Sequence, residues 1–291
     1  MVIASVIVPT YKGSLFITNL LESLGWQSFD DFEAVIVVKP SGDGTEDIVR
    51  KKCRVLGLPY KILFQHEGYL THALNMGIRN SNGDILLFTD DDAILPKDWV
   101  INNIKRHVRF QSCGAISGGR VELTKYRSVR SAYFAVPFFK SRRRLRTGEL
   151  ASRMMRSLRW GIIGSLIDKP HPIFSDYRLG VFITRRFRVA KGPNIFGKIC
   201  LSLPYFGTNM SFKREAIENV LLPEHPMIRI APYWEQYLGV SVVLQGWEAL
   251  YDPEITVYHV EREGVSAFTN EVERRMMSLK LEELINQYNR R

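Results

Sequence analysis

Three consecutive aspartates, Asp90, Asp91 and Asp92, directly follow the largely apolar run of residues 84–89. Crowded carboxylates repel one another and bind protons more tightly unless a cation neutralises them. Carboxylate oxygens are ligands that suit Mg²⁺ or Mn²⁺, and these ions commonly bind phosphate groups as well. The triplet therefore predicts a divalent-cation site for a diphosphate-bearing ligand. The alternative is a solvated acidic loop before a helix that starts near Pro96.

The segments around the triplet alternate between strand-like and helix-like patterns. Apolar and β-branched runs predict four short strands, at residues 5–9, 32–38, 60–64 and 84–89. Helix-period runs lie between them, through residues 15–24, 45–56 and 71–79. This alternation predicts an α/β fold with a mainly parallel central sheet. Ligands bind beyond the carboxyl ends of the strands in such sheets, which is where the aspartates fall.

The last third of the chain resumes the mixed pattern. Residues 204–212 predict an irregular strand, helices begin near Lys213 and Trp234, and residues 255–260 alternate as a strand. Apolar side chains recur at roughly helical spacing near the end of the chain, at Val272, Met276, Leu279, Leu284, Ile285 and Tyr288. We expect this tail to form a packing or docking helix rather than part of a cofactor site.

Composition limits the class of protein. With 291 residues, 45% of them apolar and 24% charged, the chain is typical of a globular domain and not of a disordered protein. Its 3 cysteines form no CxxC pair, which excludes a disulfide scaffold and a cysteine zinc site and fits a reducing compartment. The first residues enter a strand pattern at once and no apolar stretch reaches ~18 residues, so we expect neither a signal peptide nor a span. The last residues are compatible with a natural end or with a cut before a span.

Positive charge is concentrated in the middle of the chain. Residues 120–191 contain 18 lysines and arginines against 4 acidic residues, whereas the whole chain has a net charge of +10. Such segregation predicts a polyanionic partner, either phosphates or an anionic membrane surface. A solvated basic face is the simpler alternative. Because no zinc-finger spacing or RNP-like aromatic motif accompanies the charge, we do not expect a nucleic-acid partner.

Large apolar residues are interleaved with these charges in residues 133–139 and 154–167. Basic residues beside Trp, Phe and Leu are typical of helices that lie in the headgroup layer of a membrane. Burial of the apolar residues in the protein's own core is the alternative. The side chains expected to contact the membrane or a lipid phosphate are Arg142, Arg143, Arg144, Arg153, Arg156 and Arg159.

Several short motifs also occur in a characteristic order. They are SVIVPTY (5–11), GDGT (42–45), ALNMGI (73–78), GDILLFTDDD (83–92), GTNMSFKREA (207–216), LG (238–239), GW (246–247), YDPE (251–254) and VYH (257–259). Together they resemble the inverting family 2 glycosyltransferases of GT-A fold, including membrane-associated enzymes of the cellulose-synthase-like and dolichol-phosphate-sugar-synthase type. The ordered matches cover residues 1–118 and 203–260, and each motif alone is weak.

The resemblance implies a single GT-A domain, a Rossmann-like fold, with a basic amphipathic insert. Residues 1–119 would form its nucleotide-sugar-binding half and residues 201–262 its acceptor-binding and catalytic half. Residues 120–200, which match no motif of the family, would form the insert that faces the membrane or the acceptor. Residues 263–291 would form the C-terminal helix.

The resemblance also implies roles for individual residues. Asp92 would bind the divalent cation, Mn²⁺ or Mg²⁺. His259 lies where some GT-A enzymes place a further metal or diphosphate contact, although a lone histidine on a strand is commonly structural. The residues expected at the base, ribose and diphosphate of the nucleotide are Pro9, Thr10, Tyr11, Asp43, Asp90 and Asp91.

Glu235 stands at the position of the family's general base, which is normally an aspartate. A glutamate preserves the carboxylate chemistry, but its extra methylene moves the reactive oxygens, and positioning affects rates strongly. The alternative is a glutamate that only stabilises the first turn of a helix. If Glu235 is the base, the acceptor is expected to be a hydroxyl, because a phosphate acceptor is already ionised.

The donor is expected to be a nucleotide diphosphate sugar. The family usually has an aspartate after the second strand that pairs with the base, often uracil, whereas this chain has Val38, Lys39 and Pro40 there. The departure favours a GDP-sugar such as GDP-mannose over a UDP-sugar. We therefore expect transfer of a hexose to a lipid-linked glycan at the cytoplasmic face of the membrane, by a peripheral or anchored enzyme. A polyprenyl- or dolichyl-phosphate glycosyltransferase is the nearest alternative, and a non-catalytic sugar- or lipid-binding protein is a distant one.

Overall fold

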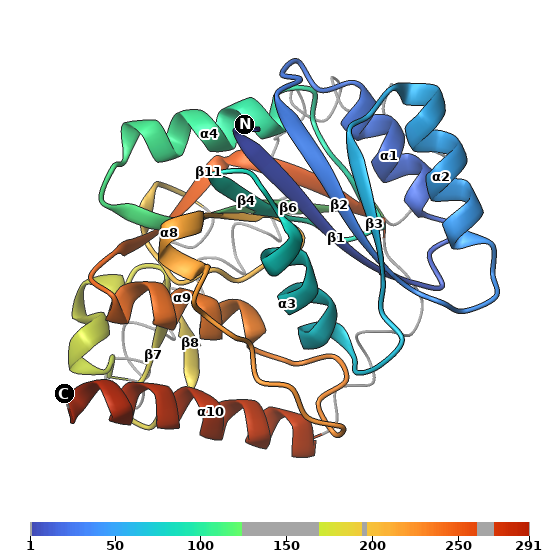
Figure 1. Cartoon of the computed structure of the whole chain (residues 1–291). Coiled ribbons are helices and arrows are strands. Elements are labelled where there is room, and N and C mark those ends of the chain that lie inside the picture. The colour runs from blue at the N-terminus through green and yellow to red at the C-terminus, as the bar shows by residue number, and fades with distance from the viewer. Residues whose placement is uncertain (1, 124–168, 194–196, 261–270, 291) are drawn as a thin grey trace.

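The computed structural model describes residues 2–123, 169–193, 197–260 and 271–290 (Figure 1). The strands of its central sheet are β1 (Ala4–Tyr11), β2 (Phe32–Lys39), β3 (Tyr60–Phe64), β4 (Ile85–Phe88), β5 (Ala93–Ile94), β6 (Cys113–Leu123), β9 (Cys200–Leu201), β10 (Met210–Lys213) and β11 (Glu248–Val260). A separate hairpin consists of β7 (Val181–Ile183) and β8 (Val189–Lys191). The helices are α1 (Ile17–Gly25), α2 (Thr45–Leu56), α3 (Leu70–Asn80), α4 (Trp99–Arg109), η2 (Pro172–Tyr177, a 3₁₀ helix), α8 (Arg214–Ile217), α9 (Trp234–Leu244) and α10 (Glu271–Asn289).

The central sheet is mainly parallel, as the alternating pattern predicts. β1 pairs in parallel with β2 and β4, β2 with β3, and β6 with β11. β10 lies antiparallel between β4 and β6. The order of the sheet is β3-β2-β1-β4-β10-β6-β11-β5, with β9 paired to β11. The α/β prediction is confirmed, but the sequence patterns missed β6 and the first half of β11.

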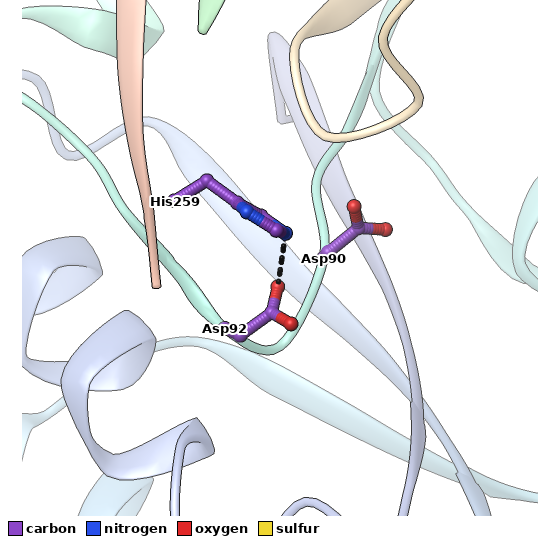
Figure 2. A group of neighbouring side chains, drawn as sticks. All are labelled: Asp90, Asp92 and His259. Atoms are coloured by element: carbon purple, nitrogen blue, oxygen red, sulfur yellow. Dashed lines mark ion pairs between the residues drawn. The ribbon is translucent and has the colours of Figure 1, made fainter. Parts of the chain in front are cut away.

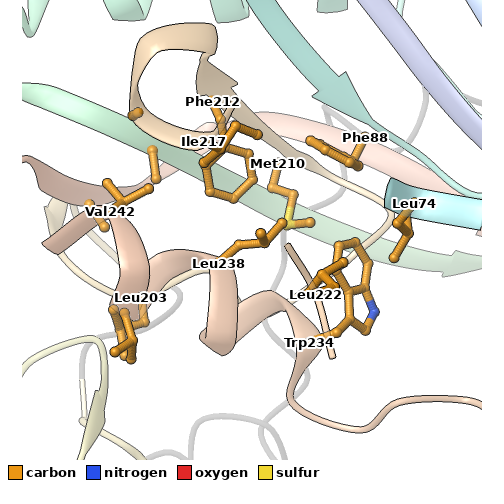
Figure 3. Close-up of a cluster of buried hydrophobic side chains, with 14 of the residues drawn as sticks. Leu74, Phe88, Leu203, Met210, Phe212, Ile217, Leu222, Trp234, Leu238 and Val242 are labelled. Carbon is orange, nitrogen blue, oxygen red and sulfur yellow. The ribbon is translucent and has the colours of Figure 1, made fainter. Parts of the chain in front are cut away.

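Helices cover both faces of the sheet because successive strand residues point to opposite sides. Along β1, Val6 and Val8 belong to a core shared with α1, α2 and α4. Ile7 points to the other core, which includes side chains of α3, α8, α9 and α10. Figure 3 shows part of this second core, with Phe88 and Phe212 of the sheet facing Trp234 and Leu238 of α9. The two cores hold the carboxyl ends of β1, β2 and β4 in a fixed arrangement.

The described part of the predicted insert packs against this second core. Phe174 of η2 and Phe182 of β7 are fully buried in it. The backbone N–H of Val181 donates to Ser202 Oγ at 2.9 Å, which joins the β7–β8 hairpin to the chain before β10. The expected start of the insert at residue 120 falls within β6, since this strand continues to Leu123. Residues 169–193 thus contribute to the core of the domain.

The C-terminal helix is present, and the residues through which it packs overlap the expected set only in part. Met277, Leu281 and Ile285 are fully buried and lie four residues apart, so they form one stripe toward α9. Val272 and Leu279, which the sequence pattern assigned to the packing face, are about half exposed. Ile285 was expected and belongs to the stripe, and the expected Met276 and Leu284 are partly buried against the same core. Within the described residues, no helix is both long and apolar enough to cross a membrane.

Candidate active site

The aspartate triplet lies at the carboxyl end of β4, in the centre of the sheet. The short strand β5 follows it at once and pairs antiparallel with the end of β11, with His259 opposite Ala93. The backbone N–H of Val260 donates to the carbonyl of Asp92 at 3.0 Å. Backbone pairing therefore brings His259 next to Asp92, although the two residues are far apart in the sequence.

Two of the aspartates and His259 form one compact group (Figure 2). Asp90, Asp92 and His259 each offer one ligand atom, and these atoms all lie within 4.8 Å of one another. The Nε2 atom of His259 lies 3.2 Å from Asp92 Oδ1. Two carboxylates and an imidazole are donors that suit Mn²⁺ or Mg²⁺, so the residues present fit the expected cation. The structure adds Asp90 to the predicted ligands Asp92 and His259.

Electrostatics in this group reflect its crowding. Burial raises the pKa of Asp90 well above its usual range, and the charge of Asp92 raises it further. Burial works in the opposite direction at His259, but the hydrogen bond and charge of Asp92 outweigh it and raise the pKa of the imidazole to about 9. Without a cation, the imidazolium therefore partly neutralises the carboxylates. A divalent cation could take over that role.

Asp91 points to a different part of the site. Its carboxylate accepts a hydrogen bond from the hydroxyl of Thr10 at the end of β1. Gly13 lies against both groups, because a Cβ added there would be 2.2 Å from Thr10 Oγ1 and 2.4 Å from Asp91 Oδ2. Only glycine fits such a close approach. Tyr11, between them, is 51% exposed. The loop after β1 is thus fixed against the triplet and leaves an aromatic side chain accessible.

Asp43 connects two loops at the same end of the sheet. Its carboxylate accepts hydrogen bonds from Ser41 Oγ at 2.8 Å, from Thr45 Oγ1 at 2.7 Å and from the backbone N–H of Ser14 at 3.1 Å. Burial opposes ionisation, but these hydrogen bonds from Thr45, Ser41 and Ser14 outweigh it and hold the pKa of Asp43 far below its usual range. The side chain orders the expected nucleotide-binding loops, and its contact with the base stays a prediction.

Glu235 is placed by the first turn of α9. Tyr233, before the helix, has a positive φ of 73°, which turns the chain sharply into it. The backbone N–H of Gly207 donates to Glu235 Oε1 at 3.2 Å. A side chain on Gly207 would collide with the Trp234 ring, at 2.5 Å. Burial and, to a lesser extent, the charge of Asp90 raise the pKa of Glu235 to about 8. The expected base therefore lies within electrostatic reach of Asp90.

Two functional candidates on β6, Arg120 and Glu122, were missed as site residues. Sequence reasoning counted Arg120 only as part of the basic segment. Its charge lowers the pKa of Asp90, of Glu235 and of His259, so it lies within electrostatic reach of all three. The Oε2 atom of Glu122 lies 2.8 Å from His259 Nδ1, so it accepts a hydrogen bond when Nδ1 is protonated. The period-2 spacing of Arg120 and Glu122 on one face of a strand is the signal that could have identified them.

The arginines expected to contact the membrane cannot be placed in the candidate site. Arg142, Arg143, Arg144, Arg153, Arg156 and Arg159 are all outside the described residues. Within the described part, Lys191 of β8 lies 3.5 Å from the centre of the Tyr205 ring, and Tyr205 packs edge-on against Phe206. Arg120 lies 4.8 Å from the centre of the Phe206 ring. Basic and aromatic side chains thus meet beside Gly207 and the expected base.

A mixed sheet between two helical layers, with an acidic group after β4 and a carboxylate near it on α9, defines a GT-A domain. The family model described as "Glycosyl transferase family 2" matches residues 5–158. The chain belongs to glycosyl transferase family 2. This confirms the family expected from the ordered motifs.

Relatives and solved structures agree with this fold. The chain is 24% identical over 270 residues to the uncharacterized glycosyltransferase YfnE of Bacillus subtilis, covering 89% of this chain but 64% of YfnE. It is similar to Staphylococcus aureus TarS 1-349 in complex with UDP-GlcNAc, with a TM-score of 0.58, 16% identity, and coverage of 98% of this chain and 71% of that one. It is also similar to the mannosyltransferase PcManGT from Pyrobaculum calidifontis in complex with GDP-Man and Mn²⁺, with a TM-score of 0.58, 19% identity, and coverage of 96% and 62%.

Proposed function

We propose that this chain is a metal-dependent, inverting hexosyltransferase that uses a nucleotide diphosphate sugar. The observation that supports this most directly is that Glu235 lies close enough to Asp90 for that charge to raise its pKa, and that Asp90 is grouped with Asp92 and His259 at the carboxyl end of the sheet. A leaving-group site and a proton acceptor are the two elements that single-displacement glycosyl transfer needs. Membership of family 2 supports the same reaction class.

The donor binds across the loops after β1, β2 and β4 in this proposal. Thr10 and Asp91 fix the first loop, and Asp43 ties it to the second. Asp90, Asp92 and His259 would hold the divalent cation. When bound, the cation would supply Lewis-acid stabilisation for the charge that develops on the departing diphosphate. The exposed ring of Tyr11 is available to contact the base or ribose.

Glu235 acts on the acceptor. As the acceptor oxygen forms its bond to the anomeric carbon, the bond from that carbon to the diphosphate oxygen breaks, and the acceptor proton passes to the carboxylate. A single displacement inverts the anomeric configuration. The hydrogen bond from Gly207 holds one carboxylate oxygen, and burial gives the group an unusually high proton affinity. Both features suit a base that must take a proton from an alcohol.

A GDP-sugar, with mannose as the hexose, is the proposed donor. Lys39 ends β2 beside Tyr11, in the register of the two strands. Its ammonium group donates to the carbonyl of Gly68 and lies 4.5 Å from the centre of the Tyr69 ring. An ammonium group only donates hydrogen bonds, so Lys39 cannot replace an aspartate that accepts from uracil N3–H, and it could donate to base acceptors such as guanine O6 and N7. The fold likeness to PcManGT with GDP-Man is compatible with this donor, and the likeness to TarS with UDP-GlcNAc represents the competing one.

A thermal-shift comparison tests the donor. A ligand that binds only the native protein raises its apparent stability. We expect GDP and GDP-mannose with Mn²⁺ to raise the Tm more than UDP, UDP-glucose or UDP-GlcNAc at equal concentration. The K39D variant should reduce the preference for GDP, and the K105D variant, altered on α4, should not. A response to uridine nucleotides alone contradicts the donor proposal.

The proposed acceptor is the sugar hydroxyl of a lipid-linked glycan at the cytoplasmic face of the membrane. The excess of basic over acidic residues in residues 120–191 supports attraction to an anionic surface. Flotation with liposomes of phosphatidylcholine, either alone or with about 30% anionic lipid, tests this part. We expect binding only to the anionic liposomes, with loss at high salt and after replacement of Arg142, Arg143 and Arg144 by glutamine. No binding to anionic liposomes at low salt contradicts it.

Release of nucleoside diphosphate tests the activity itself. We expect the protein with Mn²⁺ to release it from its cognate donor, slowly with water and faster with an acceptor alcohol. D92N and E235Q should abolish the acceptor-stimulated rate, whereas D176N, which alters an exposed aspartate on η2, should keep it. If D92N and E235Q retain the full rate, the proposed site is wrong.

A further inference from the structure

The imidazole of His259 is held from both sides. Its Nε2 atom lies 3.2 Å from Asp92 Oδ1. Its Nδ1 atom lies 2.8 Å from Glu122 Oε2. The His259 side chain is 15% exposed and that of Glu122 is 38% exposed. Only the Asp92 side of the ring faces the proposed cation site, so Glu122 contacts the ring without being one of the three grouped ligands.

Glu122 reaches this position through the sheet. β6 and β11 run parallel, and their register places Glu122 beside His259. Side chains that lie beside each other on neighbouring strands point to the same face. Arg120 is two residues earlier on the same face, and its guanidinium lies 2.6 Å from Glu122 Oε1. One carboxylate oxygen is therefore bound by an arginine and the other by the histidine, which fixes the orientation of the carboxylate.

We propose that Glu122 is a positioning residue for the metal site. This proposal rests on the proposed function. Glu122 accepts a hydrogen bond from Nδ1–H of His259 and so directs the Nε2 lone pair toward the cation held with Asp90 and Asp92. Metal-binding histidines usually donate their second ring N–H to a carboxylate or carbonyl, which fixes the tautomer and the ring orientation. Arg120 in turn holds Glu122 by an ion pair.

Removal of Glu122 has two distinguishable consequences. It takes away a negative charge near the cation, which weakens binding whether or not His259 is involved. It also frees the imidazole to rotate or to change tautomer, which weakens binding only when His259 is a ligand. Loss of a group that orients a ligand in this way typically costs about 10- to 100-fold in metal affinity. A double-mutant cycle with His259 separates the two effects.

Mn²⁺ binding without donor, measured by electron paramagnetic resonance up to millimolar Mn²⁺, is the test. The variants are E122A, H259Q and E122A/H259Q. The matched control is E254Q, which removes another carboxylate that is paired with an arginine, here on β11. We expect E122A to weaken Mn²⁺ binding about 10- to 100-fold in the wild-type background. In the H259Q background the same change should weaken it less than about threefold, and E254Q should leave it unchanged.

The outcomes separate this inference from the proposed function. Equal effects of E122A in the two backgrounds, or wild-type affinity in E122A, overturn the positioning role while leaving the cation site intact. Failure of the wild-type protein to bind Mn²⁺ at all overturns the proposed metal dependence and the inference with it. A nitrogen-15 spectrum of the Mg²⁺-loaded protein gives a second readout. It should show the proton of His259 on Nδ1 in wild type and a mixture of tautomers in E122A.

Discussion

Replacing Glu235 by glutamine is expected to stabilise the protein while it strongly slows transfer. Glu235 is partly buried, and burial together with the charge of Asp90 raises its pKa to about 8. Ionising such a group is less favourable in the folded state than in the unfolded chain, so ionisation lowers the stability of the protein. A glutamine at this position would keep the shape of the side chain without the charge. Proteins commonly lose stability at groups that their function requires.

The size and sign of this effect follow from linkage. The pKa of Glu235 is about 8 in the folded protein against the ordinary value of 4.5, so the native state keeps the proton up to a higher pH than the unfolded chain does. The free energy of unfolding contributed by this group therefore falls as pH rises from about 4.5 to about 8. At 1.36 kcal/mol per pKa unit, the raised pKa lowers the free energy of unfolding by at most ~5 kcal/mol when Glu235 is fully ionised, and by ~3 kcal/mol at pH 7. Because part of the side chain reaches solvent, we expect E235Q to be stabilised by roughly 1–3 kcal/mol at pH 7.

Urea denaturation in EDTA from pH 5 to 8.5 measures the effect. The control is E218Q, which alters an exposed glutamate at the end of α8. The stability difference between E235Q and wild type should be smallest at pH 5 and should grow as pH rises, whereas E218Q should run parallel to wild type. E235Q should also lower the transfer rate by about 10²- to 10⁴-fold, as expected for a lost general base. A pH-independent difference, or a less stable E235Q at pH 8, refutes the reasoning.

Three other predictions concern the fold and the donor loop. Burial lowers the pKa of His107 from 6.5 to about 4. The free energy of unfolding should therefore decrease as pH falls from 6.5 toward 4, by ~2 kcal/mol at pH 5. The H107Q variant should show a weaker pH dependence in urea denaturation. G13A should lower the free energy of unfolding by roughly 1–3 kcal/mol and weaken nucleotide binding in a thermal-shift assay, because its Cβ would overlap the Thr10–Asp91 contact. Unchanged nucleotide binding would contradict this close approach. L281A should lower the free energy of unfolding by about 2–5 kcal/mol, and L279A by less than about 0.5 kcal/mol. Equal losses in the two variants would contradict the packing of α10.

Much of the fold could be predicted from local patterns. β1 to β4 and the helices between them have strong apolar periodicity and clear turn residues, so their positions follow from the sequence. β6 was harder, because Cys113–Leu123 contains three glycines and no regular alternation. Its place is set by pairing with β10 and β11, which only the folded chain provides. The stripe of α10 was predicted only in part for a similar reason, since half-exposed Val272 and Leu279 look as apolar as the buried residues.

The candidate site was predictable where side chains follow strand ends. Asp90 and Asp92 follow β4, and Glu235 opens a helix, so their places in the candidate site could be inferred from position and resemblance. The places of Arg120 and Glu122 could not, because they depend on the register of β6 against β11. The contacts of Asp43 were also incompletely predicted. Its hydrogen bond to the backbone of Ser14 joins two loops that the sequence presents as separate turns.

A crystal soaked with GDP-mannose and Mn²⁺, with data collected near the manganese absorption edge, tests the central claim most directly. We predict one anomalous peak between the diphosphate and the carboxylate of Asp92, with Asp90 and His259 around it and the Glu235 carboxylate on the opposite side of the anomeric carbon. A manganese ion bound elsewhere, or a diphosphate that Asp92 does not approach, would contradict the account.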